Sequence, residues 1–344
     1  MKNRPVILNS QGKPIVLNEM EQRIAAVNQK QVNALGYEVD ITTLTTIMKK
    51  VTEQKFFEIA PADYLPVRVG EGAWSSNLLT YRSFQMSDDF ATGVLNTGGN
   101  NSRLANADAG VDSVSVKVVN WAKSIGWSLM DLQMAAKAGN WDLITAKEKS
   151  RKRNWDLGIQ KIAFLGLDGD SSVKGLLNQS GVNTNTALIT KAISAMTSAE
   201  LKVLTKGLIE AYRNNCARTA FPTHFIIPES DYNGLASQAS PDFPIKSTLQ
   251  LLEEMFATMT RNSAFKILPL AYADVAYNAG IDTKQIYTLT NYEEESIRMD
   301  IPVDYTNTLA NSIDNFSFQN VGYGQFTGVM TYRTLETLYF KYTP

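Results

Sequence analysis

The middle of the chain contains the stretch Ile125-Gly-Trp-Ser-Leu-Met-Asp-Leu132, and the other predicted elements are described relative to it. It opens a short predicted helix over residues 128–137, which Gly139-Asn140 separates from a longer predicted helix over residues 141–165. A glycine-rich turn follows and ends in the apolar pair of Lys174-Gly-Leu-Leu-Asn178. Two unequal helices and a tight connector therefore form the middle of the chain.

The region before this centre divides into an arm and a long hairpin. Residues 1–66 are rich in Gln, Asn and Thr and contain one predicted helix, residues 41–57. Apolar and polar residues alternate in residues 77–86 and 112–119, as the two legs of a β-hairpin require. The Gly- and Asn-rich segment between them, residues 92–110, has too few large apolar residues for a core of its own. It is either a disordered surface loop or an arm that becomes ordered against a neighbouring subunit.

After about residue 190 the pattern changes to mixed helix and strand, which indicates a second domain. Ser198 is the predicted N-cap of its first helix, and Pro269 is predicted to end its second strand. The predicted helices are residues 198–215, 228–235 and 248–260. The predicted strands are residues 224–227 and 265–268, followed by returning strands at 285–289, 296–301, 316–323 and 328–342.

Composition excludes several classes of function. The 344 residues carry 33 basic and 34 acidic side chains, so a net charge of -1 gives no overall attraction to nucleic acid or to an anionic membrane. Any contact with DNA must therefore be local. The sequence contains no signal-peptide core and no run of about 18 apolar residues, which predicts a cytoplasmic protein without a membrane anchor.

The sequence also lacks the residues of the common catalytic and metal sites. Cys216 and His224 are the single cysteine and the single histidine, which excludes an internal disulfide and argues against metal chemistry. His224 lies in an apolar strand, where packing is the expected role. Gly12-Lys13 does not form a phosphate-binding loop because the following Pro14 has no amide hydrogen to donate. We therefore predict no catalytic residue, no cofactor and no bound metal.

Residues 147–153 are the most basic part of the chain, with five positive side chains and one negative side chain within two turns of the long helix. The run is either a solvated helix face, on which Glu148 and Lys152 form an i,i+4 pair, or a face that contacts DNA. The candidate DNA-facing residues are Lys147, Lys149, Arg151, Lys152 and Arg153.

The order of these segments resembles the major capsid proteins of tailed bacteriophages, a family that has the Hong Kong 97 fold and is related to encapsulins. Thr334 departs from the family pattern, which often has a proline there, and residues 1–66 are matched only by position. The resemblance covers about residues 70–344. It rests on the stretch 125–132 together with Ala135-Ala-Lys-Ala-Gly139, Ile162-Ala-Phe-Leu-Gly166, Lys174-Gly-Leu-Leu-Asn178, Met299-Asp-Ile-Pro302 and Gly328-Val-Met-Thr-Tyr-Arg-Thr334.

The resemblance implies an α+β protein with five segments, of which the final strand is a candidate to join the A domain. The segments are an N-terminal arm (1–66), an E-loop (67–120), a P domain with its spine helix (121–189), an A domain (190–284) and returning P-domain strands (285–344).

It also implies a set of partners. The protein would self-assemble into hexamers and pentamers that form an icosahedral head shell around the phage double-stranded DNA, which it would contact without regard to sequence. A portal protein at one vertex, a separate scaffolding protein and an optional decoration protein are implied as well. Neither a membrane nor a cofactor is implied. Assembly would take place in the host cytoplasm, and the mature protein would reside in the virion capsid.

Under this resemblance the important residues are interface residues. We predict that Tyr81 and Phe84 on one hairpin leg, and Leu95, Arg103 and Leu104 at the tip, contact neighbouring subunits. The two interpretations of the basic run agree if the long helix faces the inside of a shell filled with DNA. Covalent cross-links between subunits are not expected, because the hairpin has no lysine before Lys117, which lies far from the tip.

Two alternatives remain open. An encapsulin nanocompartment shares the fold, but its cargo groove would need an amphipathic helix near residue 1, where Pro5, Gly12 and Pro14 interrupt any helix. An α/β hydrolase would need a nucleophile motif of the Gly-x-Ser-x-Gly type and a catalytic base, and His224 is the single histidine. Electron microscopy separates the three, since they predict large shells, small shells with an enclosed enzyme, and small particles with turnover.

Overall fold

The structure, a computed structural model, describes residues 7–8, 14–15, 55–70, 74–86, 108–137, 142–239, 246–278 and 281–344. The chain divides into two units, residues 1–56 with 134–141 and residues 57–133 with 142–344. In the first unit, β1 (Ile7–Leu8) pairs antiparallel with β2 (Pro14–Ile15). The predicted arm helix at 41–57 lies outside the described residues except for Lys55–Phe57, which are not helical.

The helices along the chain lie close to their predicted positions. α2 (Leu129–Lys137) and α3 (Leu143–Leu165) confirm the short and the long helix of the centre. The later helices are α4 (Ser198–Asn215), α5 (Glu229–Ser237) and α6 (Thr248–Thr260). Short 3-10 helices lie at Pro61–Asp63, Ile193–Ala195, Ala271–Ala273 and Thr334–Glu336.

The start of α4 corrects one prediction, because its N-cap is Thr197 and not Ser198. The hydroxyl of Thr197 accepts a hydrogen bond from the backbone of Glu200, and the Glu200 carboxylate accepts one from the Thr197 backbone at 2.8 Å. This reciprocal pair is a capping box, which requires the acidic residue three positions after the cap. Glu200 therefore fixes the helix start one residue earlier than Ser198 alone suggested.

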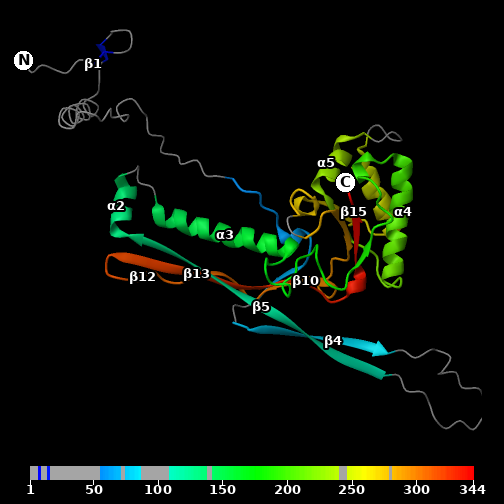
Figure 1. Cartoon of the computed structure of the whole chain (residues 1–344), viewed down its shortest axis with the longest axis horizontal. Helices are drawn as coiled ribbons and strands as arrows, with labels where there is room; N and C mark the ends of the chain where they lie inside the picture. The colour runs from blue at the N-terminus through cyan, green and yellow to red at the C-terminus, as the bar shows by residue number, and fades with distance from the viewer. Residues whose placement is uncertain are drawn as a thin grey trace, which may run out of the picture. The chain divides into compact units, whose positions relative to one another are not determined.

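A long antiparallel sheet with the strand order β11-β13-β5-β4 is the main feature of the second unit (Figure 1). Its strands are β4 (Asn77–Met86), β5 (Asp108–Ser128), β11 (Val303–Asn307) and β13 (Ser317–Thr327), and the short β12 (Asn311–Ser312) pairs with β13. β5 has 21 residues, many more than the predicted 112–119. Its first part pairs with β4 up to Lys117, and its second part pairs with β13 from Val118 onward. Each part of this continuous strand therefore has one paired neighbour, β4 along its first part and β13 along its second.

Two further sheets complete the unit. β3 (Val67–Val69), β10 (Ile297–Ile301) and β14 (Val329–Thr331) form the order β14-β10-β3, in which β3 runs parallel to β10. The third sheet has the order β6-β15-β9-β7-β8. Its strands are β6 (Asn183–Asn185), β7 (His224–Pro228), β8 (Lys266–Leu270), β9 (Gln285–Thr290) and β15 (Thr337–Tyr342).

The prediction that Pro269 ends its strand is wrong, and the edge position of β8 explains why. Pro269 lies inside β8, opposite Ile227 of β7. A proline cannot donate a hydrogen bond to a neighbouring strand, but β8 has a partner on one side only. An edge strand tolerates proline for this reason.

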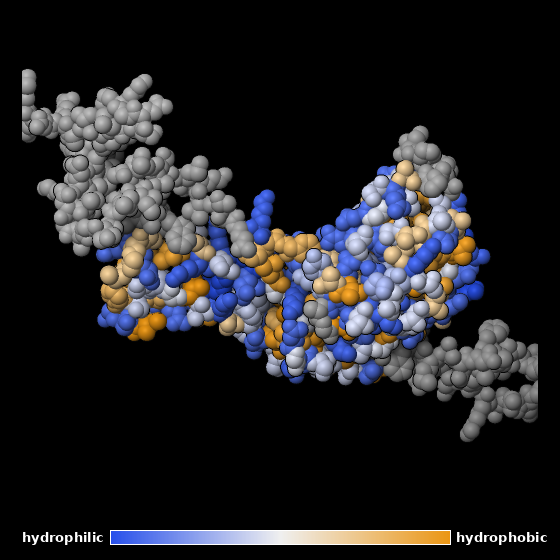
Figure 2. Space-filling view, turned by 45° about the horizontal axis from the view of Figure 1, so that its top comes forward, coloured by the Kyte–Doolittle hydropathy of each residue, from blue (hydrophilic) through white to orange (hydrophobic). Residues whose placement is uncertain are grey.

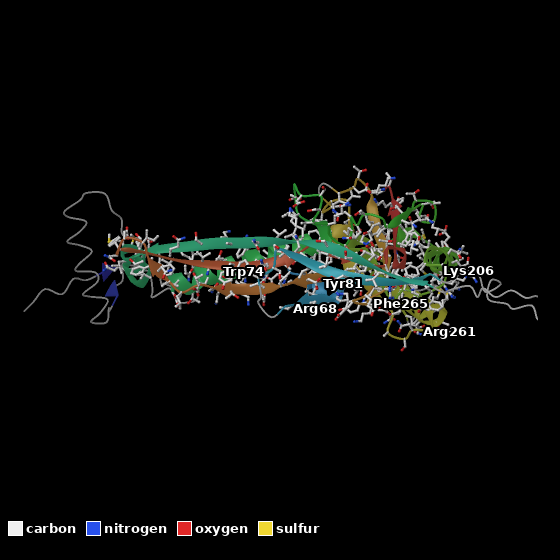
Figure 3. All side chains as sticks on the ribbon, turned by 90° about the horizontal axis from the view of Figure 1, so that it is seen from below. Arg68, Trp74, Tyr81, Lys206, Arg261 and Phe265 are labelled. Carbon is white, nitrogen blue, oxygen red and sulfur yellow. The ribbon has the colours of Figure 1, made fainter. Side chains whose placement is uncertain are left out.

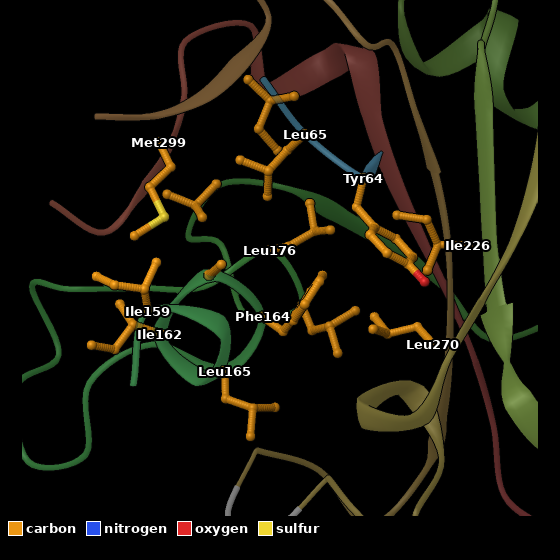
Figure 4. Packing of buried hydrophobic residues seen from close by; sticks show 14 of the residues in the cluster. Tyr64, Leu65, Ile159, Ile162, Phe164, Leu165, Leu176, Ile226, Leu270 and Met299 are labelled. Carbon is orange, nitrogen blue, oxygen red and sulfur yellow. The ribbon is translucent and has the colours of Figure 1, made fainter. Parts of the chain in front are cut away.

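The first hydrophobic core lies between the C-terminal half of α3, the segment before β3 and two of the sheets (Figure 4). Phe164 and Leu176 are fully buried in it, and the Tyr64 ring meets Phe164 edge-on at 5.1 Å between centroids. α3 ends at Gly166, whose φ of 84° is a conformation that glycine adopts readily. A Cβ on Gly175 would lie 2.4 Å from the Phe164 backbone, so only glycine lets the connector return against the helix.

The second core lies between α4, α6 and one face of the five-stranded sheet. Phe256 of α6 packs between two other aromatic rings, with centroid distances of 4.7 Å to Phe265 and 5.3 Å to Phe225. Alternate residues of β7 divide between the two cores, since Phe225 belongs to this core and Ile226 to the first. The sheet is therefore buried on both faces.

Candidate assembly surfaces

The hairpin of β4 and β5 touches the rest of the unit mainly near its base. Arg298 Nη2 donates to Thr80 Oγ1 at 3.2 Å, and its guanidinium lies over the Tyr332 ring at 4.8 Å from the centroid. Lys117 Nζ donates to Asp170 at 2.6 Å, and this bond is the main reason that the pKa of Asp170 lies below its usual range. The base of the hairpin is thus held to the body, while the paired strands continue for nine residues toward Met86 and Asp108.

One face of the hairpin exposes large apolar side chains. Tyr81 is 69% exposed, and Leu79 on β4 and Val111 on β5 are exposed as well. Leu79 and Tyr81 share a face because side chains alternate along a strand, and Val111 joins them because it pairs with Ser83. Figure 3 labels Tyr81 on this strand, together with Trp74, which precedes β4 and stacks on Tyr323 at 5.5 Å. The face presents apolar area that nothing in the described residues covers.

The predicted interface residues are only partly within the described ranges. Tyr81 lies on the exposed hairpin face, and the backbone of Phe84 pairs with Gly110. The Phe84 side chain and the tip residues Leu95, Arg103 and Leu104 lie outside what the structure describes. Sequence reasoning missed Leu79 and Val111, although the period-2 pattern of residues 77–86 already put Leu79 on the face of Tyr81.

The basic run of α3 has a mixed environment. Lys149 and Lys152 are exposed. Lys147 Nζ donates to the Gly126 carbonyl oxygen at 2.7 Å, and Arg153 forms an ion pair with Glu58 at 3.5 Å. Four of the five predicted DNA-facing side chains therefore keep at least part of their surface in solvent.

The fifth predicted DNA-facing residue, Arg151, does not face solvent, because its guanidinium is buried and only 2% of the residue is exposed. It donates to the Tyr305 hydroxyl, to Asn307 Oδ1 and to both oxygens of Asn320, at 2.8 to 3.1 Å. Gly322 makes room for it, since a Cβ there would lie 2.6 Å from Arg151 Nε. The side chain joins α3 to β11 and β13, and its guanidinium is not open to solvent in the subunit.

His224 has the packed role that the sequence predicts. Its ring is buried and stacks on Tyr292 at 4.8 Å, and Nδ1 lies 3.0 Å from Thr223 Oγ1. Burial, with a smaller contribution from Lys266, lowers the pKa of His224 to about 4. Within the described ranges, no group of three or more His, Cys, Asp or Glu side chains is placed to hold a metal ion. None of the described helices has the length and apolar character that a membrane span requires.

Comparison with known proteins adds independent findings. A family model described as major capsid protein matches residues 95–342, which is most of the chain. No curated protein matches the sequence. Among solved structures, the capsid of Myoviridae phage XM1 is similar with a TM-score of 0.69 at 17% identity, over 89% of this chain and 99% of that one.

Two further structures are similar over most of their length. The mature capsid of bacteriophage PhiM1 gives a TM-score of 0.57 at 11% identity, over 87% of this chain and 92% of that one. The capsid of a native GTA particle gives a TM-score of 0.56 at 10% identity, over 90% of this chain and 99% of that one. At these identities the likeness establishes the fold, which is that of phage capsid proteins and agrees with the predicted Hong Kong 97 type.

Proposed function

Because the chain belongs to the major capsid protein family, we propose that it builds an icosahedral head shell of hexamers and pentamers around phage double-stranded DNA. The family is a structural one, and the protein is accordingly a phage capsid subunit. The observation that carries the proposal is β5, a 21-residue strand whose second part is fixed in the body and whose first part forms the hairpin with β4. A ribbon whose described contacts with the body lie near its base is suited to lie on a neighbour.

The exposed face of the hairpin supplies the apolar side chains of this contact. Tyr81, Leu79 and Val111 leave apolar area in water, and covering apolar area contributes roughly 25 cal/mol per Å². Tyrosine is enriched at protein interfaces because its ring is apolar while its hydroxyl can still find a partner. We therefore assign these three side chains, with the hairpin tip, to the contact between adjacent subunits.

The proposed contact with DNA involves the solvent-facing side of α3. Lys149 and Lys152 are exposed there, and Arg153 lies one turn beyond Lys149, whereas Lys147 donates to the Gly126 carbonyl oxygen of β5. Lysine and arginine bind phosphates without reading the base sequence. A local basic face on a protein of net charge -1 fits a subunit that touches packaged DNA on one side only.

Other partners follow from the same proposal. A portal protein would occupy one vertex, and a scaffolding protein and a decoration protein would act during assembly or on the outside. The boundaries of arm, E-loop, P domain and A domain remain part of the proposal, although β9, assigned to the returning P-domain strands, lies in the five-stranded sheet with β7 and β8. The last strand, β15, pairs with β9 and β6 in the five-stranded sheet, which supports its assignment to the A domain.

Deletion of residues 93–109 tests the proposal together with two substitutions of Tyr81. The shortened subunit and Tyr81→Ser should unfold at the temperature of the parent but form few closed shells, because the deleted segment has too few large apolar residues for a core of its own and Tyr81 is 69% exposed. Tyr81→Phe keeps the ring and serves as the matched control, which should assemble normally. Normal shells from the shortened protein in electron micrographs would overturn the assignment of the hairpin. Small shells that enclose a foreign protein would favour the encapsulin alternative.

A further inference from the structure

A cavity of about 280 Å³ lies between the base of the hairpin and the sheet β14-β10-β3, and we refer to it as the arginine cavity. Charged side chains line it from the body and hydroxyl side chains line it from the hairpin. These are Arg68 on β3, Arg298 and Asp300 on β10, Ser75 before β4 and Thr80 on β4. Figure 3 labels Arg68 near the hairpin strand that carries Tyr81. A ligand in the arginine cavity would therefore lie between the hairpin and the body.

The charged groups of the arginine cavity share one face of the small sheet. The parallel register places Arg68 opposite Asp300, and Arg298 points to the same face because it lies two residues before Asp300 on β10. Asp300 Oδ2 accepts a hydrogen bond from Arg298 Nε at 3.1 Å. Arg68 has no hydrogen bond or ion pair with any residue that the structure describes. Two positive side chains against one negative side chain leave the cavity with a charge of +1.

The Arg298 side chain is held in place before a ligand arrives. Nη2 donates to Thr80 Oγ1 at 3.2 Å, the guanidinium lies over the Tyr332 ring, and the side chain is 16% exposed. Nη1 has no hydrogen-bond partner within the described ranges, so it can donate to a ligand. A guanidinium that is already fixed loses little side-chain entropy when it binds an acceptor.

Its charge distinguishes the arginine cavity from two larger cavities. A cavity of about 420 Å³ is lined by Lys266 and Asp63, whose charges cancel, and a pKa of about 4 keeps its His224 neutral at pH 7. A cavity of about 480 Å³ beside β6 is lined by uncharged residues. Strongly hydrophilic residues are spread over the visible face of the protein in Figure 2, so one exposed arginine alone would not indicate a site. Two arginines in one cavity favour a bound anion.

The donors of the arginine cavity match a phosphate group. Guanidinium groups bind carboxylates and phosphates through paired N–H donors. A carboxylate has two oxygens, which one guanidinium can satisfy, whereas this cavity offers two guanidiniums on different strands and the hydroxyls of Ser75 and Thr80. The apolar side chains of Leu78 and Leu79 leave a place for an organic group beside the phosphate. We propose that the arginine cavity of the subunit binds a small phosphate-bearing anion.

Titration calorimetry on the unassembled full-length subunit, at constant ionic strength, tests the proposal. Inorganic phosphate should bind at one site per subunit with a dissociation constant on the order of 1 mM or lower, as two charge-assisted contacts allow. Acetate should bind at least about tenfold more weakly, because it lacks acceptors for the second guanidinium. Tighter binding of glycerol phosphate than of inorganic phosphate would support an organic phosphate as the ligand, and weaker binding would support the inorganic ion.

Three substitutions place the binding in this cavity. Arg68→Gln removes one exposed guanidinium and should weaken phosphate binding by about tenfold or more, while the unfolding temperature in phosphate-free buffer stays unchanged. Arg261→Gln alters an exposed arginine that follows α6 and is the matched control, which should bind like the parent. Glu71 lies outside the described residues but follows Gly70 of the cavity in the sequence. Glu71→Gln should bind phosphate at least as tightly as the parent.

Four outcomes would overturn the proposal. They are the absence of saturable phosphate binding, equal affinities of Arg68→Gln and Arg261→Gln, equal affinities for phosphate and acetate, and binding by Glu71→Gln but not by the parent. The last of these would mean that a carboxylate of the same chain occupies the cavity. Shell formation does not enter these measurements, so their result is separate from that of the proposed function.

Discussion

Replacing Arg151 by methionine separates the structural role of this side chain from the proposed role of its basic neighbours. Methionine keeps most of the volume of the side chain but removes every hydrogen-bond donor of the guanidinium. The exposed Lys152, next in the sequence, provides a matched control in Lys152→Met. If Arg151 acted on DNA, the two variants would behave alike in folding experiments.

The expected loss follows from which acceptors the substitution leaves without a donor. Asn307 and Lys123 are exposed, so their oxygens can bind water instead. Asn320 is 5% exposed, and its side-chain and backbone oxygens both lose a buried partner. Each unsatisfied buried acceptor costs about 1–2 kcal/mol, which gives a loss of about 2–4 kcal/mol in the free energy of unfolding.

Urea unfolding of the unassembled subunit measures this loss. With a denaturant dependence of about 3 kcal/mol per M, the midpoint for Arg151→Met should fall by about 1 M. Lys152→Met should change the free energy of unfolding by less than about 0.5 kcal/mol, as exposed substitutions usually do. Equal midpoints for the two variants would refute the assignment of Arg151 as the fastener between α3 and the long sheet.

Three other predictions can be tested on the unassembled subunit and on assembled shells. Lys149→Gln combined with Lys152→Gln should leave shells intact but release packaged DNA at lower salt than the parent, and identical retention across a salt series would mean that α3 faces elsewhere. Mature shells boiled in detergent should give a single band near 38 kDa, because the nearest hairpin lysine, Lys117, is bonded to Asp170; a ladder of multimers would contradict this. His224 should contribute a loss of up to about 3 kcal/mol of stability as the pH falls from about 6.5 to about 4, because unfolded His224 gains a proton in this window while the folded residue, with its pKa near 4, stays neutral. His224→Gln should flatten this part of the stability profile, and an unchanged profile would show that His224 does not cause it.

Local patterns in the sequence predict most of the secondary structure, because each depends on neighbouring residues. The alternation in residues 77–86 predicts β4 with its correct bounds, and α6 begins and ends where its pattern does. The prediction for β5 stopped at residue 119, where the regular alternation of valines ends. The strand continues to Ser128 because β13, about 190 residues later in the chain, supplies its hydrogen bonds. A partner so distant leaves no local pattern.

The candidate sites were less predictable than the fold for a related reason. Arg151 belongs to a charged run, and nothing near it in the sequence distinguishes it from Lys152. Its burial depends on Asn320 and Gly322, which provide acceptors and space from the other end of the chain. Sites of this kind can be identified only from the structure, which shows the strands that lie far apart in the sequence side by side.

A density map of the assembled particle at a resolution that shows side chains tests the central claim most directly. The account predicts a closed shell of hexamers and pentamers in which the β4–β5 hairpin of each subunit lies on an adjacent subunit and Tyr81 is buried in that contact. A map in which the hairpin folds back on its own subunit, with Tyr81 in solvent, would contradict it.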